Sequence, residues 1–439
     1  MKSLLLAAGR RCAGYSIKST RGNSLARAFA ASASSEIERS LLSYHQKLDM
    51  IKKEQTQFIV KEPLEQIEFP KDLATMGINF SDLIVYEIKN KRPIPADKKF
   101  NYPSNSFVRV HFPLATNEEL RKFMIRVGGK KVRIGRLLEI MDLMAGRVSY
   151  THCDTTFDKG SFRVVTASVD SIQFYPNELD ILKNVTLDAY LCYTGTSSME
   201  VRIDVFNSEM KLYCSACYVM VARDNKTGKA YPIPHLAFDL EADPETAKMR
   251  YHVGKLRQEY RIEKSKNSLY KELPKWDEMK VLHNLFREQQ EDTDPNNPKT
   301  NYLKIQKTEI QKVLLKHYQD RNIHGRVFGG LLMRECIEVA YACAMLQPYF
   351  VNPQVYFIDD IYFIKPVDVG EFVRYTALIT YTEGSLVHVK VEVEKAVIGE
   401  KEVKYSKATE FNLVLTFTKQ EGTELTILPE TYEEAMLYL

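Results

Sequence analysis

One carboxylate in this sequence stands where a charge is costly. Asp142 lies within LLEIMDLMAG, an apolar segment whose spacing predicts a helix. An ionised side chain among Leu and Met is unfavourable unless a neighbouring strand bonds it or it faces solvent. Where neither holds, such a carboxylate is a functional candidate, and burial would raise its pKa. We therefore treat Asp142 as a candidate nucleophile or activator of water.

The helix that carries Asp142 has a counterpart in the second half of the chain. IGRLLEIMDLMAGRVSYTHC begins at Ile134, FGGLLMRECIEVAYACAM begins at Phe328, and each predicted helix opens on a glycine, Gly135 or Gly329. Leu and Met recur at helical spacing in both, and small residues permit close approach by a covering sheet. We expect both helices to be largely buried.

The segments after the two helices also match, and in the same order. VTASVDSIQF from Val165 pairs with VYFIDDIYFI from Val355, and YTGTSSMEVRIDVF from Tyr193 pairs with YTEGSLVHVKVEVE from Tyr381. Valines alternate with charged residues in the last segment, which indicates a half-buried strand. The repeat predicts an α+β fold of two modules, each a long helix wrapped by a curved antiparallel sheet.

The two copies differ at the positions that carry chemistry. Counted from the opening glycine, the position of Asp142 is Cys336 in the second copy, which therefore lacks the carboxylate. Asn322 precedes the second glycine by seven residues, and the same count in the first copy reaches Gly128. A site between the modules would combine Asp142 with Asn322, and its pseudo-symmetric counterpart would lack both. A turn or helix cap is the alternative role for Asn322.

The sequence resembles the tandem hotdog acyl-coenzyme A thioesterases over nearly everything after about residue 80. The motifs that carry the resemblance are RIGRLLEIMD, VTASVDSI, TSSMEV, MVARD, NIHGRVFGGLLMRE and TYEEAMLYL. It implies two hotdog modules that form an intramolecular pseudo-dimer and hydrolyse fatty acyl-CoA to free fatty acid and CoA. In that family an Asn from one module acts with an Asp from the other; here the Asp comes first along the chain.

The resemblance also implies roles for further residues. Thioester hydrolysis needs a nucleophile and donors for the developing oxyanion, so Gly329 and Gly330 at the start of the second helix become candidate donors, with tight packing as their alternative role. Substrate and coenzyme contacts are expected at His324, Arg326, Lys390, Arg202 and Ser197, although each cation can equally be a solvated surface charge. No cofactor or metal is expected, and further association into a homo-oligomer is.

The implied organisation has six parts. They are a transit peptide (1–35), an N-terminal extension (36–104), hotdog module 1 (105–236), a charged helical linker (237–301), hotdog module 2 (302–425) and a C-terminal tail (426–439).

The first 35 residues differ in composition from the rest. They hold six of the 61 Lys and Arg residues and none of the 57 Asp and Glu residues. This is typical of a mitochondrial transit peptide, so we expect the matrix as destination; a disordered basic tail is the alternative. Without this segment the chain is slightly acidic, which gives no support to nucleic-acid binding. No stretch approaches the roughly 20 apolar residues of a membrane-spanning helix, so no integral membrane segment is expected.

Other chemistries find weaker support. Cys214 and Cys217 form a lone CxxC inside a predicted strand, where residues three apart point to opposite faces, so buried thiols are expected. A hydratase of this fold would need a histidine five residues after Asp142, where Arg147 stands. The dehydratase-like His-Phe-Pro at His111 is followed by Leu-Ala-Thr instead of the expected prolines and glycine. A non-catalytic acyl-CoA sensor or carrier is a further alternative.

Overall fold

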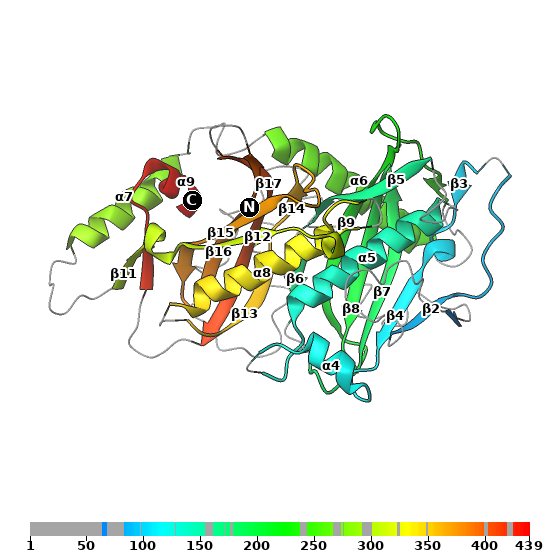
Figure 1. Ribbon diagram of the computed structural model, residues 1–439, viewed down its shortest axis with the longest axis horizontal. Coiled ribbons are helices and arrows are strands. Elements are labelled where there is room, and N and C mark those ends of the chain that lie inside the picture. Colours follow the sequence, from blue (N-terminus) through cyan, green and yellow to red (C-terminus); the bar gives the residue numbers. More distant parts are fainter. Residues whose placement is uncertain are drawn as a thin grey trace.

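A single large antiparallel sheet runs through the molecule, with two central helices on it (Figure 1). The computed structural model describes residues 64–67, 83–96, 98–127, 129–153, 161–170, 172–175, 179–237, 244–266, 274, 276–291, 301–322, 325–347, 350–398, 403–418 and 425–439. The expected transit peptide, Gly128 and His324 lie outside these residues.

The first module is built around α5 (Ile134–His152), an almost wholly buried helix. Its apolar residues repeat every three to four positions around the helix, so they face the sheet on one side and the neighbouring helix on the other. The strands of this module are β4 (Val108–Phe112), β5 (Phe162–Val169), β6 (Ile172–Phe174), β7 (Val185–Thr194), β8 (Ser198–Phe206) and β9 (Leu212–Asp224).

The second module repeats this order around α8 (Gly329–Met345). Its strands are β12 (Ile310–Leu315), β13 (Val351–Ile358), β14 (Ile361–Phe363), β15 (Phe372–Glu383), β16 (Leu386–Ile398) and β17 (Val403–Thr418). The valines that alternate in β16 are buried, as the pattern predicted. The expected fold class, α+β with two tandem hotdog modules, is confirmed.

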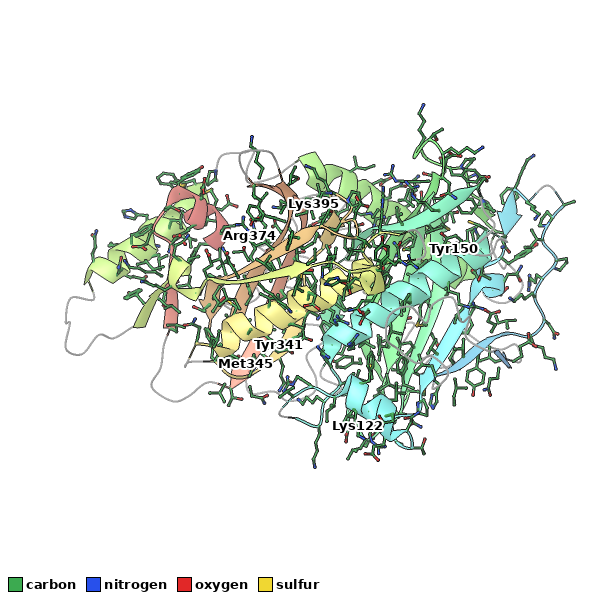
Figure 2. All side chains as sticks on the ribbon, in the orientation of Figure 1. Lys122, Tyr150, Tyr341, Met345, Arg374 and Lys395 are labelled. Atoms are coloured by element: carbon green, nitrogen blue, oxygen red, sulfur yellow. The ribbon has the colours of Figure 1, made fainter. Side chains whose placement is uncertain are left out.

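The modules join through the sheet and through the helices. β5 pairs with β14, and β6 pairs with β13, so each module contributes one strand of each kind to the junction. α5 packs against α8, and their C-terminal ends point away from each other, with Tyr150 near one outer end and Met345 near the other (Figure 2). The middle of α5 therefore meets the beginning of α8, where the buried core of both modules is continuous.

Smaller elements surround the modules. β1 (Leu64–Ile67) and β2 (Ile84–Ile88) extend the sheet beyond β4. The others are β3 (Phe100–Asn101), η3 (Pro103–Ser106), α4 (Glu118–Met124), β10 (His235–Leu236), β11 (Asn301–Lys304), η4 (Ile305–Thr308), η5 (Tyr318–Asp320), β18 (Leu425–Leu428) and α9 (Tyr432–Tyr438). Within the described residues, no helix is long and apolar enough to cross a membrane.

Two helices lie in the interval expected to be a charged linker, α6 (Pro244–Lys266) and α7 (Trp276–Glu291). α6 is not simply solvated, because it packs on the face of the sheet opposite α5. Gly254 lies so close to Tyr193 that an added Cβ would fall 2.5 Å from the Cβ of the tyrosine. The guanidinium of Arg257 is buried against the carboxylate of Glu200 in β8. Both faces of β7 and β8 are consequently buried.

Candidate functional site

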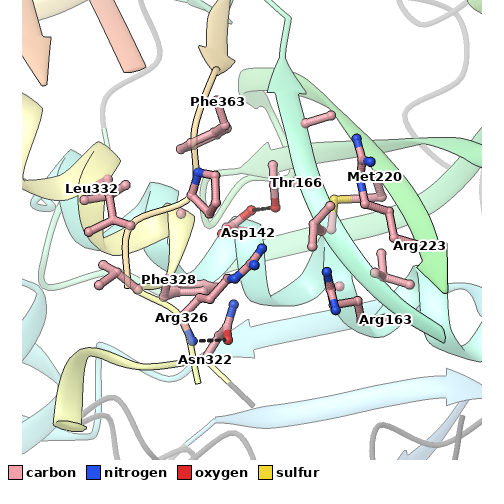
Figure 3. A pocket seen from close by; sticks show the side chains of 18 of the residues that line it. Asp142, Arg163, Thr166, Met220, Arg223, Asn322, Arg326, Phe328, Leu332 and Phe363 are labelled. Carbon is pink, nitrogen blue, oxygen red and sulfur yellow. Dashed lines mark hydrogen bonds between the residues drawn. The ribbon is translucent and has the colours of Figure 1, made fainter. Parts of the chain in front are cut away.

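A cavity of about 430 Å³ lies at the junction of the two modules (Figure 3). Module 1 contributes one side of α5, the edge of β5 and part of β9; module 2 contributes the turn before α8, the first residues of α8 and the segment that follows β14. The cavity exists because β14 is short: it pairs with β5 only at Ser168 and Val169, so the rest of the β5 edge is not covered by that strand.

Asp142 is at the centre of this cavity, and both of its oxygens are bonded. The hydroxyl of Thr166 donates to Oδ1 at 2.7 Å, and the backbone N–H of Gly330 donates to Oδ2 at 2.8 Å. The side chain is 2% exposed. Burial raises the pKa of Asp142 to about 6; the two hydrogen bonds lower it, and the nearby Glu139 carboxylate adds to the rise. The group thus changes charge close to neutral pH, as a general base should.

The start of α8 reaches the carboxylate because two glycines stand there. A Cβ on Gly329 would lie 3.2 Å from Oδ2 of Asp142, and a Cβ on Gly330 would lie 2.8 Å from the Cα of Glu139. A larger residue at either position would push the modules apart. The N–H of Gly330 is one of the donors that a helix start leaves without a helical partner, and here it orients Asp142 instead of facing an open oxyanion position.

Asn322 lines the same cavity as Asp142, which places the two predicted residues in one site from different modules. Its side-chain oxygen accepts the N–H of Arg326 at 3.1 Å, and its own N–H donates to the carbonyl of Arg326 at 2.6 Å. Asn322 therefore closes the turn that leads into α8, in agreement with its alternative role, while its side chain also borders the cavity (Figure 3).

Four cationic side chains border the cavity. Arg163 on β5 and Arg223 on β9 stand opposite each other in the sheet register, and Arg326 and Lys365 come from module 2. The Nε of Arg163 is buried without a hydrogen-bond partner. Arg326 approaches Asp368 at 3.4 Å, and Lys365 donates to Ser406 at 2.6 Å. This end of the cavity favours an anionic group.

Three other predicted contacts do not line this cavity. Arg202 is buried and donates to Asp204 at 2.9 Å, and Lys390 is buried 3.3 Å from Glu410. Ser197 lies in the turn between β7 and β8, where its carbonyl accepts the N–H of Ala222. Arg202 and Lys390 point outward from their strands as the alternation predicted, but they are committed to ion pairs on the sheet. Of the predicted cations, only Arg326 borders the cavity.

The pseudo-symmetric counterpart of Asp142 has no comparable chemistry. Cys336 is fully buried in the core and does not line the cavity, and burial raises the pKa of its thiol well above the ordinary value. Cys214 and Cys217 are buried free thiols, as expected for a strand in the core. Among the described residues, no group of His, Cys, Asp and Glu side chains has the arrangement of a metal site.

The residues of the hydratase and dehydratase alternatives also lie elsewhere. Arg147 forms an ion pair with Glu87, and the ring of His111 is 3.1 Å from the hydroxyl of Thr186. Neither lines the cavity.

Sequence reasoning missed Thr166, Arg163, Arg223 and Lys365. The segment VTASVDSI was identified as a strand, and its alternation was the available signal that Thr166 turns toward the helix. The facing arginines had no such signal, because the register between β5 and β9 cannot be read from one strand alone.

The chain is similar to known proteins in sequence and in structure. The model of the Thioesterase superfamily matches residues 324–401. "Acyl-coenzyme A thioesterase 9, mitochondrial" of Homo sapiens is 31% identical over 354 residues, which is 76% of this chain and 76% of that protein. "Acyl-coenzyme A thioesterase 2, chloroplastic" of Humulus lupulus is 32% identical over 295 residues, 64% of each chain. A putative oleoyl thioesterase of Lactobacillus plantarum has a TM-score of 0.44 at 13% identity, covering 68% of this chain and 93% of that one.

Proposed function

The chain belongs to the acyl-coenzyme A thioesterases, which are thioester hydrolases, and on this premise we propose that it hydrolyses fatty acyl-CoA at one composite site between its modules. The observation that carries the proposal is the bonding of Asp142: a buried carboxylate of module 1 is held by Thr166 of its own module and by the N–H of Gly330 from module 2. A buried charge held in this way, beside a cavity, is suited to catalysis.

Asp142 acts in its ionised form. Its carboxylate either removes a proton from a water molecule that attacks the thioester carbonyl, or attacks that carbonyl itself. In both cases the C–S bond breaks and CoA leaves as a thiolate, which needs no strong acid. A single turnover in oxygen-18 water distinguishes the routes, because only direct attack, followed by hydrolysis of the anhydride, leaves the heavy isotope in the side chain of Asp142.

The donors for the developing oxyanion come from module 2. Asn322 borders the cavity and its amide can donate without changing charge. Gly329, the first residue of α8, lies next to the carboxylate, so its N–H is close to the reacting carbonyl and at the positive end of the helix. The N–H of Gly330 holds Asp142 in place until the reaction.

The phosphates of CoA bind at the cationic end of the cavity. Arg163, Arg223, Arg326 and Lys365 supply the positive charge, which replaces the earlier expectation for Arg202 and Lys390. Arg163→Ala should raise KM for acyl-CoA about ten-fold, as expected for loss of one charge-assisted hydrogen bond. The same change should leave KM unaltered for a short pantetheine thioester without phosphates. An equal rise in KM for both substrates would contradict this assignment.

The catalytic assignment is tested by hydrolysis of a panel of acyl-CoAs. Asp142→Asn should lower kcat about 10²–10⁴-fold, the usual contribution of a general base, while Cys336→Ala should retain nearly full activity because that thiol borders no cavity. Full turnover by a folded Asp142→Asn protein would contradict the mechanism. A wild-type protein that binds acyl-CoA but hydrolyses none of them would instead favour a sensor or carrier.

The site acts inside mitochondria, in line with the printed names of the animal relatives and with the basic, acid-free first 35 residues. A fluorescent protein fused behind residues 1–35 should reach the matrix; diffuse cytosolic fluorescence would contradict this. The fused pair of modules associates further into a homo-oligomer, which light scattering of the purified chain tests directly.

A further inference from the structure

Three residues of α5 face the cavity in a straight row. Asp142, Gly146 and Tyr150 are each four positions apart, so they lie on one side of the helix, and all three line the cavity. With a rise of about 1.5 Å per residue, Tyr150 stands about 12 Å along the helix from the carboxylate. The row therefore begins at the reacting group and ends at an aromatic ring.

Empty space lies above Gly146. A Cβ built on this glycine would meet no atom within 4 Å, whereas a Cβ on the helical glycine Gly254 would overlap Tyr193 at 2.5 Å. Close packing thus explains Gly254 but not Gly146. Glycine inside a helix costs about 1 kcal/mol relative to alanine, and here the missing side chain keeps the cavity open.

Tyr150 closes the row because it is fixed on two sides. Its side chain is 3% exposed, and its hydroxyl accepts the N–H of Val164 at 2.9 Å. Its ring lies parallel to that of Phe162, with 6.2 Å between the centroids. A ligand that advances over Gly146 reaches this ring and cannot displace it without breaking the bond to the strand.

The strand β5 separates this row from the cations. Val164 is buried toward Tyr150, and Arg163 beside it in sequence points to the other face of the sheet, where Arg223 stands opposite. An apolar chain and a phosphate group thus find their partners on different faces of one strand, with Asp142 between them.

We propose that the acyl chain of the substrate lies along Asp142, Gly146 and Tyr150, with Gly146 as the opening of the channel and Tyr150 as its end. The inference rests on the proposed hydrolysis of acyl-CoA and sets its substrate range. A chain of single bonds about 1.5 Å long advances about 1.3 Å per carbon, so a channel of about 12 Å holds about nine or ten carbons. The preferred substrates are therefore short- and medium-chain acyl-CoAs.

The test compares kcat/KM for acetyl-, octanoyl- and palmitoyl-CoA in four proteins: wild type, Gly146→Ala, Gly146→Leu and Tyr150→Ala. Gly146→Leu should lower kcat/KM for octanoyl-CoA about ten-fold or more, as overpacking of a filled space does, and leave acetyl-CoA nearly unchanged. Gly146→Ala should act in the same direction but less. Tyr150→Ala should raise palmitoyl-CoA relative to octanoyl-CoA, and Tyr150→Phe, which keeps the ring, serves as its matched control.

The outcomes separate this inference from the proposed function. Normal hydrolysis by wild type with an unchanged chain-length profile in Gly146→Leu would overturn the channel alone. An equal loss for all three substrates in a folded Gly146→Leu protein would also overturn it, because the leucine would then block the reacting group and not the chain. Absence of hydrolysis by wild type for every chain length would overturn the proposed function, and the channel with it.

Discussion

Replacing Asp142 by asparagine is expected to stabilise the protein at neutral pH while it removes activity. Burial raises the pKa of Asp142 from 3.8 to about 6, in spite of the hydrogen bonds from Thr166 and Gly330. The folded state therefore prefers the protonated carboxyl. That preference stabilises the fold fully below pH 3.8, and its contribution is lost as the pH rises through 6.

The magnitude follows from the two pKa values. The difference between 3.8 and about 6 corresponds to about 3 kcal/mol at 1.36 kcal/mol per pKa unit, which is what the ionised carboxylate costs the folded state at pH 7.5. An asparagine side chain at this position would carry no charge; its oxygen can accept the N–H of Gly330 and its amide can donate to the hydroxyl of Thr166. Neutral hydrogen bonds are weaker by about 1 kcal/mol, so we expect a net gain of about 1–2 kcal/mol.

The assay is urea unfolding of wild type and Asp142→Asn at pH 4.5 and pH 7.5. The variant should have the higher midpoint at pH 7.5 and nearly the same midpoint at pH 4.5. Glu288→Gln, which removes a charge from the exposed side of α7, is the control and should change neither midpoint. If Asp142→Asn proves less stable than wild type at pH 7.5, or if its gain does not depend on pH, burial does not explain the raised pKa.

Three further predictions concern the same site and its support. Because Asp142 acts as a carboxylate, kcat/KM should rise with pH and level off above a pKa near 6; a rate independent of pH between 5 and 7 would contradict this. Thr166→Val removes a hydrogen bond that lowers the pKa of Asp142, so the same profile should shift to higher pH; an unshifted profile with reduced activity would assign Thr166 a purely structural role. Arg257→Ala leaves the carboxylate of Glu200 buried without its closest cation and should cost about 3–5 kcal/mol of unfolding free energy; an unaltered midpoint in urea would show that α6 is held by other contacts.

The fold was predictable because its signals are local. Apolar residues at helical spacing define α5 and α8, and the alternation in β16 has a period of two, so each element could be identified without its partners. Asp142 was identified for the same reason: a carboxylate inside an apolar helix is visible in the sequence alone. The repeat then placed Asn322 and Asp142 in one site, and both line the cavity.

The rest of the site depends on contacts between distant segments. Arg202 and Lys390 occupy outward positions of their strands, which predicts exposure, yet both are buried by ion pairs with Asp204 and Glu410. Arg163 borders the cavity only because β14 ends early and leaves the edge of β5 uncovered. The charged composition of α6 likewise gave no indication that it would cover the sheet. Strand register and strand length across the junction decided each case.

The most direct test of a single site shared by both modules is a double-mutant cycle of Asp142→Asn and Asn322→Ala, measured as kcat/KM with octanoyl-CoA. If the two residues act on the same thioester, each single variant should lose activity about 10²-fold or more, and the double variant should lose much less than the product of the two losses. If instead each module hydrolyses substrate independently, each single variant would retain about half of the activity, and the losses of the double variant would simply add. The second result would contradict the account.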